Sequence, residues 1–452
     1  MKIVIVGCGK VGMTLAEQLS GEGHNITIVD LSPVKIQLAT GKLDIMGVVG
    51  NGASFAIQLE AGVEKADLFI AVTGADELNL LCCLMARKGG KCHTIARVRN
   101  PLYSREIGFI KERLGISMII NPELAAANEI ARLLRFPSAI KIDTFAKGKV
   151  EMLKFKLKPE FGLDGWRVTD VISKLKGDVL FCSVEREDLV AIPDGNFVLR
   201  NNDMVSIIAS PQRAADFFKK IGLETHQVKS SMIVGGGTIA YYLAKQLLEM
   251  GIEIRIVELN KDRCEQLSEL LPKAVIINGD GTDQNLLMEE GLVRAESFVA
   301  ITNLDEENLL LALFAKKYSK AKLVAKVNRI AFDDIIDGLD IGSVIYPKFL
   351  TADYIIQYAR AMQNSIGSNV ETLYKILDGR AEALEFSVHE RSEVTDIPLS
   401  DLNLKDNLLI CCINRKGAIL TPRGQDKIKV NDTVVIVTTQ KGLHDIKDIL
   451  KK

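Results

Sequence analysis

The sequence has 452 residues, enough for about three domains of ordinary size. Lysine and arginine number 57 and aspartate and glutamate 58, so the net charge is −1, without the basic excess of a nucleic-acid-binding protein. Hydrophobic residues make up 47% and charged residues 25%, a balance that excludes a largely disordered chain.

The apolar runs and the cysteines indicate in which cellular compartment the protein lies. The longest apolar runs, such as Leu80–Ala86 and Leu309–Ala315, are far shorter than the roughly 18 residues of a membrane helix. The chain begins Met-Lys and enters a glycine turn at once, so no signal peptide is predicted. Eight cysteines without a CxxC motif and only five histidines favour buried free thiols over disulfides or a metal site. We therefore expect a cytoplasmic protein with no metal.

Short β-branched runs alternate with helical stretches from the N-terminus onward, the pattern of a parallel α/β sheet. The predicted strands are Lys2–Val6, Asn25–Val29, Ile45–Val49, Leu68–Val72, His93–Val98 and Met118–Ile120. The predicted helices are Val11–Gly21, Pro33–Thr40, Phe55–Ala61, Glu77–Lys88, Pro101–Leu114 and Glu123–Leu134. This order predicts a Rossmann-like, doubly wound sheet with a ligand crevice at the carboxyl ends of its strands.

A glycine-rich turn joins the first strand to the first helix. Its residues are Gly7, Cys8, Gly9, Lys10, Val11 and Gly12. With Asp30 at the end of the second strand, the turn has the context of a dinucleotide-binding motif. Asp30 is placed to accept hydrogen bonds from ribose hydroxyls, and its charge favours NAD or an adenosine nucleotide over NADP. The alternative is that the glycines only form a tight strand-to-helix turn.

Two further groups follow the fourth and fifth strands. Thr73 ends the fourth strand, beside the predicted nucleotide, and Asp76 follows as a possible N-cap of the next helix. Arg97 and Arg99 end the fifth strand, where a cation could meet a terminal phosphate. The alternative for both arginines is a solvated charge or an ion pair within the subunit.

Residues 150–225 and 380–452 hold two or three β-rich runs each. Among them are Leu180–Val184, Met204–Ile208, Leu408–Ile413 and Thr433–Thr438. Turns fall at Pro193–Gly195 and Pro422–Gly424. Asp203 and Asp432 each follow an asparagine just before a strand, which is a turn signature before it is a site.

The chain contains an internal duplication, with matches 228 residues apart in the glycine turns and 229 apart thereafter. The four predicted domains are 1–140 and 229–370, both Rossmann-like, and 141–226 and 371–452, both small α+β domains. Candidate ligand residues of the second copy are Gly235, Gly237, Thr238, Ile239, Ala240, Glu258, Asp280 and Thr302. Lys326 and Arg329 lie near the positions of the two arginines. Whether this second crevice binds a ligand stays open.

These residues resemble the RCK family, also called KTN, of domains that regulate potassium transport. The resemblance rests on the glycine turn, on the loops Gly50–Ser54 and Ala71–Asn79, and on their repetition. The tandem arrangement is similar to the TrkA family, the peripheral subunits of bacterial Trk potassium-uptake systems, and the similarity covers all 452 residues.

The resemblance implies ligands and partners that spacing does not show. Family members bind NAD(H) and ATP or ADP, and they form a ring of RCK domains beneath a membrane potassium-channel subunit. For a tandem chain the ring is a homotetramer that gates the channel by changing shape. The residues that match the family's nucleotide loops are Asn51, Ala53, Ser54, Thr73, Asp76, Arg97 and Arg99. Segments Pro122–Pro137 and Pro347–Ala361 match the family's dimerisation helix and crossover, with packing on the same subunit's sheet as the alternative.

The leading hypothesis is therefore a nucleotide-sensing regulatory subunit without catalysis, peripheral on the inner membrane face through its partner. One alternative is an NAD-dependent oxidoreductase that uses His24, His93 or Lys88 as acid/base. Another is a cytoplasmic redox regulator that uses the thiols.

Overall fold

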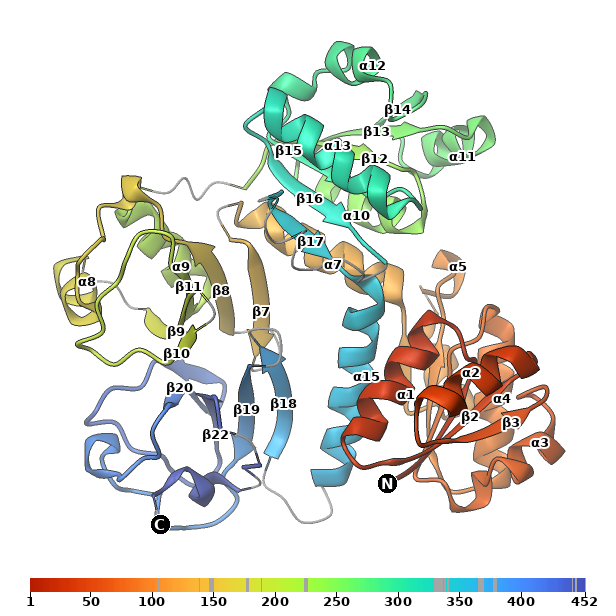
Figure 1. Cartoon of the computed structure of the whole chain (residues 1–452), viewed down its shortest axis with the longest axis horizontal. Coiled ribbons are helices and arrows are strands. Elements are labelled where there is room, and N and C mark those ends of the chain that lie inside the picture. The colour runs from red at the N-terminus through yellow and green to blue at the C-terminus, as the bar shows by residue number, and fades with distance from the viewer. Residues whose placement is uncertain are drawn as a thin grey trace. The chain divides into compact units, whose positions relative to one another are not determined.

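We describe a computed structural model of the chain. It describes residues 1–452 except 105, 138, 146–149, 176–178, 188, 223–226, 329–335, 337, 338, 340, 365–369, 377–379, 441, 444 and 452. The chain forms two compact units. One joins Met1–Ala131 with Ser230–Ala359, here called the front domains, and the other joins Arg132–Lys229 with Arg360–Lys452, the rear domains (Figure 1).

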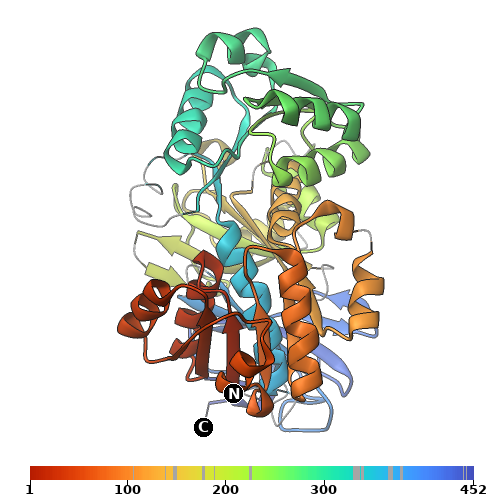
Figure 2. The same ribbon diagram turned by 90° about the vertical axis from the view of Figure 1, so that its right-hand side faces the viewer.

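The first front domain is a six-stranded parallel sheet in the order β3-β2-β1-β4-β5-β6. Its strands are β1 (Lys2–Val6), β2 (Asn25–Asp30), β3 (Met46–Val49), β4 (Leu68–Ala71), β5 (His93–Arg97) and β6 (Met118–Ile120). Its helices are α1 (Lys10–Gly21), α2 (Pro33–Lys42), α3 (Phe55–Glu60), η1 (Val63–Lys65), α4 (Asp76–Gly89), α5 (Pro101–Ser104), α6 (Ile107–Leu114) and α7 (Pro122–Arg135). Helices cover both faces of this sheet (Figure 2), so the β-branched residues of the central strands β1 and β4 are buried.

The second front domain repeats this topology in the order β14-β13-β12-β15-β16-β17. Its strands are β12 (Ser230–Val234), β13 (Glu253–Glu258), β14 (Val275–Asn278), β15 (Ser297–Ala300), β16 (Lys322–Lys326) and β17 (Ser343–Ile345). Its helices are α10 (Thr238–Glu249), α11 (Lys261–Leu270), α12 (Gln284–Glu289), η4 (Leu292–Arg294), α13 (Asp305–Tyr318) and α15 (Pro347–Asn364). The doubly wound fold is thus confirmed in both copies.

The rear domains are two five-stranded antiparallel sheets of the same topology, β10-β9-β11-β8-β7 and β21-β20-β22-β19-β18. The first has β7 (Lys141–Phe145), β8 (Val150–Lys156), β9 (Leu180–Arg186), β10 (Leu189–Ala191) and β11 (Met204–Ala209), with η3 (Pro159–Phe161), α8 (Val168–Leu175) and α9 (Pro211–Lys220). The second has β18 (Val370–Ile376), β19 (Ala381–Ser387), β20 (Leu408–Arg415), β21 (Ala418–Leu420) and β22 (Asp432–Thr438), with η6 (Leu399–Asp401) and η7 (Ile446–Ile449). One apolar cluster, which includes Phe145, Cys182, Cys411 and Val437, draws residues from both sheets.

Each rear domain contains the same ion pair between a buried aspartate and a partly exposed arginine. Arg186 donates from Nε and a terminal nitrogen to the two carboxylate oxygens of Asp203, each at 2.8 Å. Arg415 pairs with Asp432 in the same way, at 2.9 and 2.8 Å. Both aspartates also accept a backbone N–H from the turn that precedes them. The turn signature at Asp203 and Asp432 therefore marks a bidentate clamp that holds two strands and a turn together.

Two expectations about these elements were wrong. The predicted helix Pro101–Leu114 is two helices, α5 and α6, and a separate N-cap, Glu106, begins the second one. Each rear domain has five strands, although only two or three β-rich runs were predicted. Strands such as β8 carry several charged residues, here Glu151, Lys154 and Lys156, so their composition resembles that of surface segments.

The two front domains contact each other through the segments expected for dimerisation. The amide of Asn121 donates to the Tyr242 hydroxyl at 3.0 Å, and Gln246 donates to Asn128 of α7 at 2.8 Å. Tyr358 of α15 lies 3.0 Å from Nδ1 of His93. Within this unit, these segments of each copy therefore contact the other copy of the same chain.

Candidate functional site

The glycine turn after β1 is shaped by close backbone contacts. Gly7 has φ +107°, and a Cβ there would lie 3.0 Å from the backbone of Val72 and Thr73. A Cβ on Gly12 would lie 1.8 Å from the carbonyl oxygen of Gly7. Both positions therefore need glycine for the fold itself, because the turn, β4 and α1 pack without room for a side chain.

Gly9 differs from Gly7 and Gly12 because the space that its side chain would occupy is open. It is the N-cap of α1 with an extended backbone, no side chain caps the helix, and a Cβ there would meet nothing within 4 Å. The first turn of α1 also lacks acidic residues. Free N–H groups and the positive end of the helix dipole thus face an open surface, which suits a phosphate.

Asp30 links the glycine turn to the end of β2. Its Oδ2 accepts the N–H of Cys8 at 2.7 Å, and its Oδ1 accepts the N–H of Ser32 at 2.9 Å. Each carboxylate oxygen keeps a second lone pair for another donor. Asp30 therefore orders the turn, and its contact with a ribose stays a prediction.

Asn79 explains why the string Thr-x-x-Asp-Glu-x-Asn occurs twice. This fully buried side chain accepts from the backbone N–H and hydroxyl of Thr73, at 2.8 and 2.7 Å, and donates to the carbonyl of Arg97 at 2.9 Å. Asn308 makes the same bonds with Thr302 and Lys326. The asparagine fixes the carboxyl ends of two neighbouring strands, a function that the sequence analysis did not identify.

Asp76 does not cap its helix, contrary to the expectation. The N-cap of α4 is Ala75, without a side-chain cap, and that of α13 is Leu304, so Asp305 is not a cap either. Asp76 Oδ2 instead accepts the backbone N–H groups of Arg99 and Asn100, both at 2.8 Å. The carboxylate shapes the loop after β5.

The two arginines at the end of β5 turn toward the loop after β4. Arg97 donates to the carbonyl of Thr73, and its pKa is lowered by burial and by the nearby charge of Arg99. Arg99 donates to the carbonyl of Gly74 and pairs with Asp76 at 3.7 Å. Arg97 lines the crevice but Arg99 does not. Arg329, expected at an equivalent position of the second copy, lies outside the described residues.

A cavity of about 670 Å³ occupies the crevice at the carboxyl ends of the first front sheet. The predicted residues that line it are Gly7, Gly9, Lys10, Val11, Asp30, Asn51, Thr73 and Arg97. The predicted residues that lie outside its lining are Cys8, Gly12, Ala53, Ser54, Asp76 and Arg99. Asn51 shapes its own loop, since its side chain accepts the N–H of Ala53 at 3.0 Å.

The second copy also contributes to this cavity. Asn328, Pro347 and Lys348 line it, together with Lys35 and Glu123 from the first copy. None of these five was predicted from the sequence as a ligand residue, although Pro347 and its neighbours belong to a segment expected for dimerisation. The first crevice is therefore completed by residues more than 200 positions away in sequence.

Glu123 is the unusual charge of this site. Burial raises its pKa, and the backbone and the charges of Arg99 and Arg97 oppose that shift. Among the described residues, its buried Oε2 has no hydrogen-bond partner. The same carboxylate acts on Lys326 of the second copy, whose pKa is lowered chiefly by burial. Glu123 thus interacts electrostatically with arginines of the first copy and with Lys326 of the second.

The second glycine turn is more fully occupied by its own side chains. Glu258 accepts the N–H of Gly236 at 2.6 Å, as Asp30 does in the first copy. Arg263 donates from Nε to the carbonyl of Gly236 at 2.7 Å. Gly235 has φ +102°, Gly237 is the N-cap before Thr238, and Ile239 and Ala240 are buried. Asp280 accepts both donors of Thr282, which lowers its pKa.

The candidate acid/base residues of an oxidoreductase lie away from the crevice. His24 precedes β2 and His93 begins β5, so both lie at the amino ends of the strands, and Lys88 is in the last turn of α4. None of the three lines the cavity. The thiols are equally unsuited to chemistry, because all eight cysteines are buried and burial raises the pKa of Cys82 and Cys412 to about 12.

Family comparisons agree with the duplication. Residues 3–122 and 231–347 each match the TrkA-N domain family, and residues 383–451 match the TrkA-C domain family. The chain is similar to "Trk system potassium uptake protein TrkA homolog 1" of Methanosarcina mazei, with 33% identity covering 100% of both proteins. It is 30% identical to "Trk system potassium uptake protein TrkA" of Haemophilus influenzae, covering 98% of this chain and 96% of that protein.

Solved structures share the fold at low identity. The GsuK channel bound to NAD superposes with a TM-score of 0.65 at 16% identity, covering 97% of this chain and 76% of that one. The GsuK RCK domain gives a TM-score of 0.63 and covers 96% of this chain and 92% of that one. The likeness extends over both front and both rear domains. In the described parts of the chain, no helix is long and apolar enough to cross a bilayer.

Proposed function

Since the chain belongs to the TrkA family of Trk-system potassium uptake proteins, we propose that it is the nucleotide-sensing regulatory subunit of such a system. The observation that carries this proposal is the first crevice. There the open backbone at Gly9, the α1 N-terminus and Asp30 line one cavity of about 670 Å³. A cavity of this size accommodates a nucleotide.

The ligand class we propose is NAD(H) together with ATP or ADP. The open face of Gly9 would receive the phosphates, and Asp30 would accept from the ribose hydroxyls with its remaining lone pairs. The negative charge of Asp30 disfavours a 2′-phosphate, and hence NADP. GsuK, whose fold the chain shares, has been solved bound to NAD and to ADP. Asn51 and Arg97 would border the adenine and the terminal phosphate.

The second crevice is proposed as the weaker site. Arg263 already donates to the turn carbonyls there, and Lys326 and Asn328 stand where the first copy has Arg97 and Arg99. Gly235, Gly237, Glu258 and Thr302 keep the turn and the acid of a nucleotide site. We propose that this site either binds a less highly charged nucleotide or serves mainly as scaffold for the first.

The mechanism follows from the shared lining of the first crevice. A ligand there touches the glycine turn of one copy and Asn328 and Lys348 of the other. Nucleotides that differ by one phosphate therefore make different contacts across the pair of front domains. Only this difference in affinity between two arrangements of the domains can shift their populations.

We further propose that four chains form a ring under a membrane potassium-channel subunit. The supporting observation is that the two copies of one chain already provide a pair of RCK-type domains, so a homotetramer holds eight of them. The chain would be cytoplasmic and peripheral, and ligand-dependent changes of the ring would gate the partner. No catalytic step is part of this proposal.

Calorimetry of the full chain with NADH, NAD, ATP and ADP tests the ligand. We expect at least one nucleotide to bind the wild type and Glu258→Ala, and its affinity to fall at least tenfold in Asp30→Ala. Equal binding by wild type and Asp30→Ala would refute the assigned crevice. Steady oxidation of NADH with carbonyl compounds would refute the non-catalytic assignment, and light scattering tests the tetramer.

A further inference from the structure

A second cavity, of about 300 Å³, lies in the second front domain at the end of the sheet opposite to the nucleotide crevice. It is lined by the amino-terminal parts of β12 and β13 and by the segment Glu290–Ala295 around η4. The cavity lies at the amino ends of the parallel strands, because its lining includes the first residues of β12 and β13. The glycine turn lies at the other end, after the carboxyl end of β12. Its size is at the lower end of the range for small-molecule sites.

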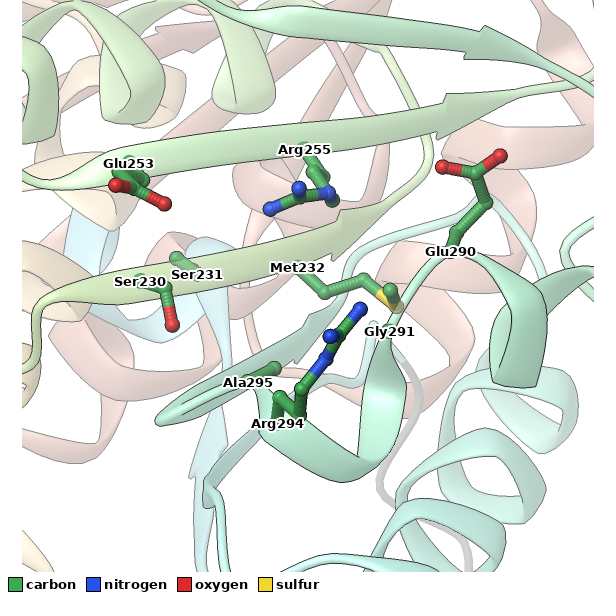
Figure 3. Close-up of a pocket in the computed structure, with 9 residues that line it drawn as sticks. All are labelled: Ser230, Ser231, Met232, Glu253, Arg255, Glu290, Gly291, Arg294 and Ala295. Atoms are coloured by element: carbon green, nitrogen blue, oxygen red, sulfur yellow. The ribbon is translucent and has the colours of Figure 1, made fainter.

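Two arginines approach this cavity from opposite sides. Figure 3 shows Arg255 reaching into it from β13 and Arg294 rising from η4 toward Met232. Arg255 is half-buried, and its strand neighbour Met232 is 1% exposed. Arg294 is exposed. Two guanidinium groups on one cavity favour an anion between them.

Two glutamates lie at the ends of the same cavity. Figure 3 shows Glu253 at one end and Glu290 at the other. Within the described residues, neither glutamate nor either arginine forms an ion pair or a side-chain hydrogen bond. Four charged groups of balanced sign thus line one space without bonding to one another.

The first copy of the duplication is an internal reference for this cavity. The positions of Met232, Arg255, Glu290 and Arg294 are occupied there by Val4, Thr27, Ala61 and Lys65. The cation at the Arg294 position is present in both copies, as Lys65 in the first, whereas Arg255 and both glutamates belong to the second copy alone.

We infer that this cavity binds a small zwitterionic metabolite of the α-amino-acid type. Its carboxylate would lie between Arg255 and Arg294, the pair suited to bidentate recognition. Its ammonium group would donate to Glu290 or Glu253, and its side chain would contact Met232. A zwitterion leaves the lining electrically balanced, whereas a phosphate dianion would add two negative charges beside two glutamates.

The test is calorimetric titration of the full chain with L-glutamate, L-glutamine, glycine betaine and inorganic phosphate. We expect an amino acid to bind with Kd below about 1 mM. Betaine, which has no N–H donor, should bind at least tenfold more weakly. Arg255→Thr and Glu290→Ala, which restore first-copy residues, should each weaken amino-acid binding at least tenfold.

Two controls keep the outcome interpretable. Asp30→Ala should leave amino-acid binding unchanged, because its site is in the other copy. Arg255→Thr should keep its melting midpoint and its nucleotide binding, which shows that the chain is folded. The inference is overturned if no amino acid binds up to 10-fold above that concentration, if phosphate binds as tightly as any amino acid, or if Arg255→Thr binds like wild type.

Discussion

Several polar side chains in the crevice stabilise the protein's own loops, although their residue types suggested contact with a ligand. Asp30, Asn79 and Asp76 all appear in nucleotide motifs, yet each is bonded to backbone groups of the protein itself. Sequence spacing identified their neighbourhood correctly because parallel strands end at one edge. It could not separate residues that hold a loop from residues that face a ligand, because both kinds occur in one motif.

Replacing Asn79 by alanine should cost about 2–4 kcal/mol of unfolding free energy, since it leaves buried backbone groups unpaired. The measurement is urea unfolding followed by circular dichroism. The same change should weaken nucleotide binding, because the loop after β4 loses its anchor. Asn308→Ala is the matched variant, with a comparable loss of stability but intact binding in the first crevice. A stability change within about 0.5 kcal/mol for Asn79→Ala would contradict this account.

The buried carboxyl of Glu123 should make the stability of the protein depend on pH. Burial raises the pKa of Glu123 above the ordinary 4.5, so the folded state favours the protonated carboxyl. The stability that comes from protonation is fully present below pH 4.5 and is lost as pH rises through the folded-state pKa. Above the folded-state pKa the charged carboxylate is therefore unfavourable, and Glu123→Gln should raise the unfolding free energy more at high pH than at low pH. The gain should shrink toward pH 4.5 in unfolding titrations. The exposed variant Glu60→Gln should show no such trend, and a pH-independent gain would count against burial as its cause.

At the scale of single elements, the glycine turn and α1 together form one structural unit. Gly12 allows the helix to approach the turn, and Gly9 leaves the helix N-terminus open. The sequence predicted this strand-turn-helix unit closely, because the three glycines and the flanking periodicity all indicate the same structure. It did not predict the break between α5 and α6, since the apolar periodicity runs on through it.

Gly9→Ala and Gly12→Ala should therefore fail in different ways. Gly12→Ala places a Cβ 1.8 Å from the Gly7 carbonyl, so it should destabilise the domain by about 2–3 kcal/mol. Gly9→Ala meets no protein atom within 4 Å, so its melting midpoint should stay close to wild type while nucleotide affinity falls. Thermal melting with and without ligand separates the two effects. Identical behaviour of the variants would show that the open face at Gly9 is not a ligand surface.

At the scale of the whole molecule, the duplication was visible in the sequence, but its consequence for the crevice was not. Registers 228 and 229 residues apart indicated two equal units. Nothing in spacing shows that Lys348 and Asn328 line the first cavity, because tertiary contacts between copies leave no periodic signal. The buried charged strands of the rear sheets escaped prediction for a related reason, since the other rear domain covers part of their surface.

Lys348→Ala provides a test of that shared lining. Removing one cation from the cavity should weaken binding of ATP about fivefold, the effect of a partly screened contact of about 1 kcal/mol. NAD, with less phosphate charge, should be affected less. Calorimetry measures both, and Lys317→Ala on α13 is a control outside the cavity. Equal weakening of both ligands by the two variants would argue against a direct contact.

A crevice built from both halves of one polypeptide has an evolutionary consequence. In an assembly of separate identical subunits, a mutation at either position would alter every site in the ring at once. Fusion of the two copies removes that symmetry, so Arg97 and Lys326, or Thr27 and Arg255, could diverge independently while stoichiometry stayed fixed. Inheritance as one gene thus allows the two halves to acquire different residues at equivalent positions.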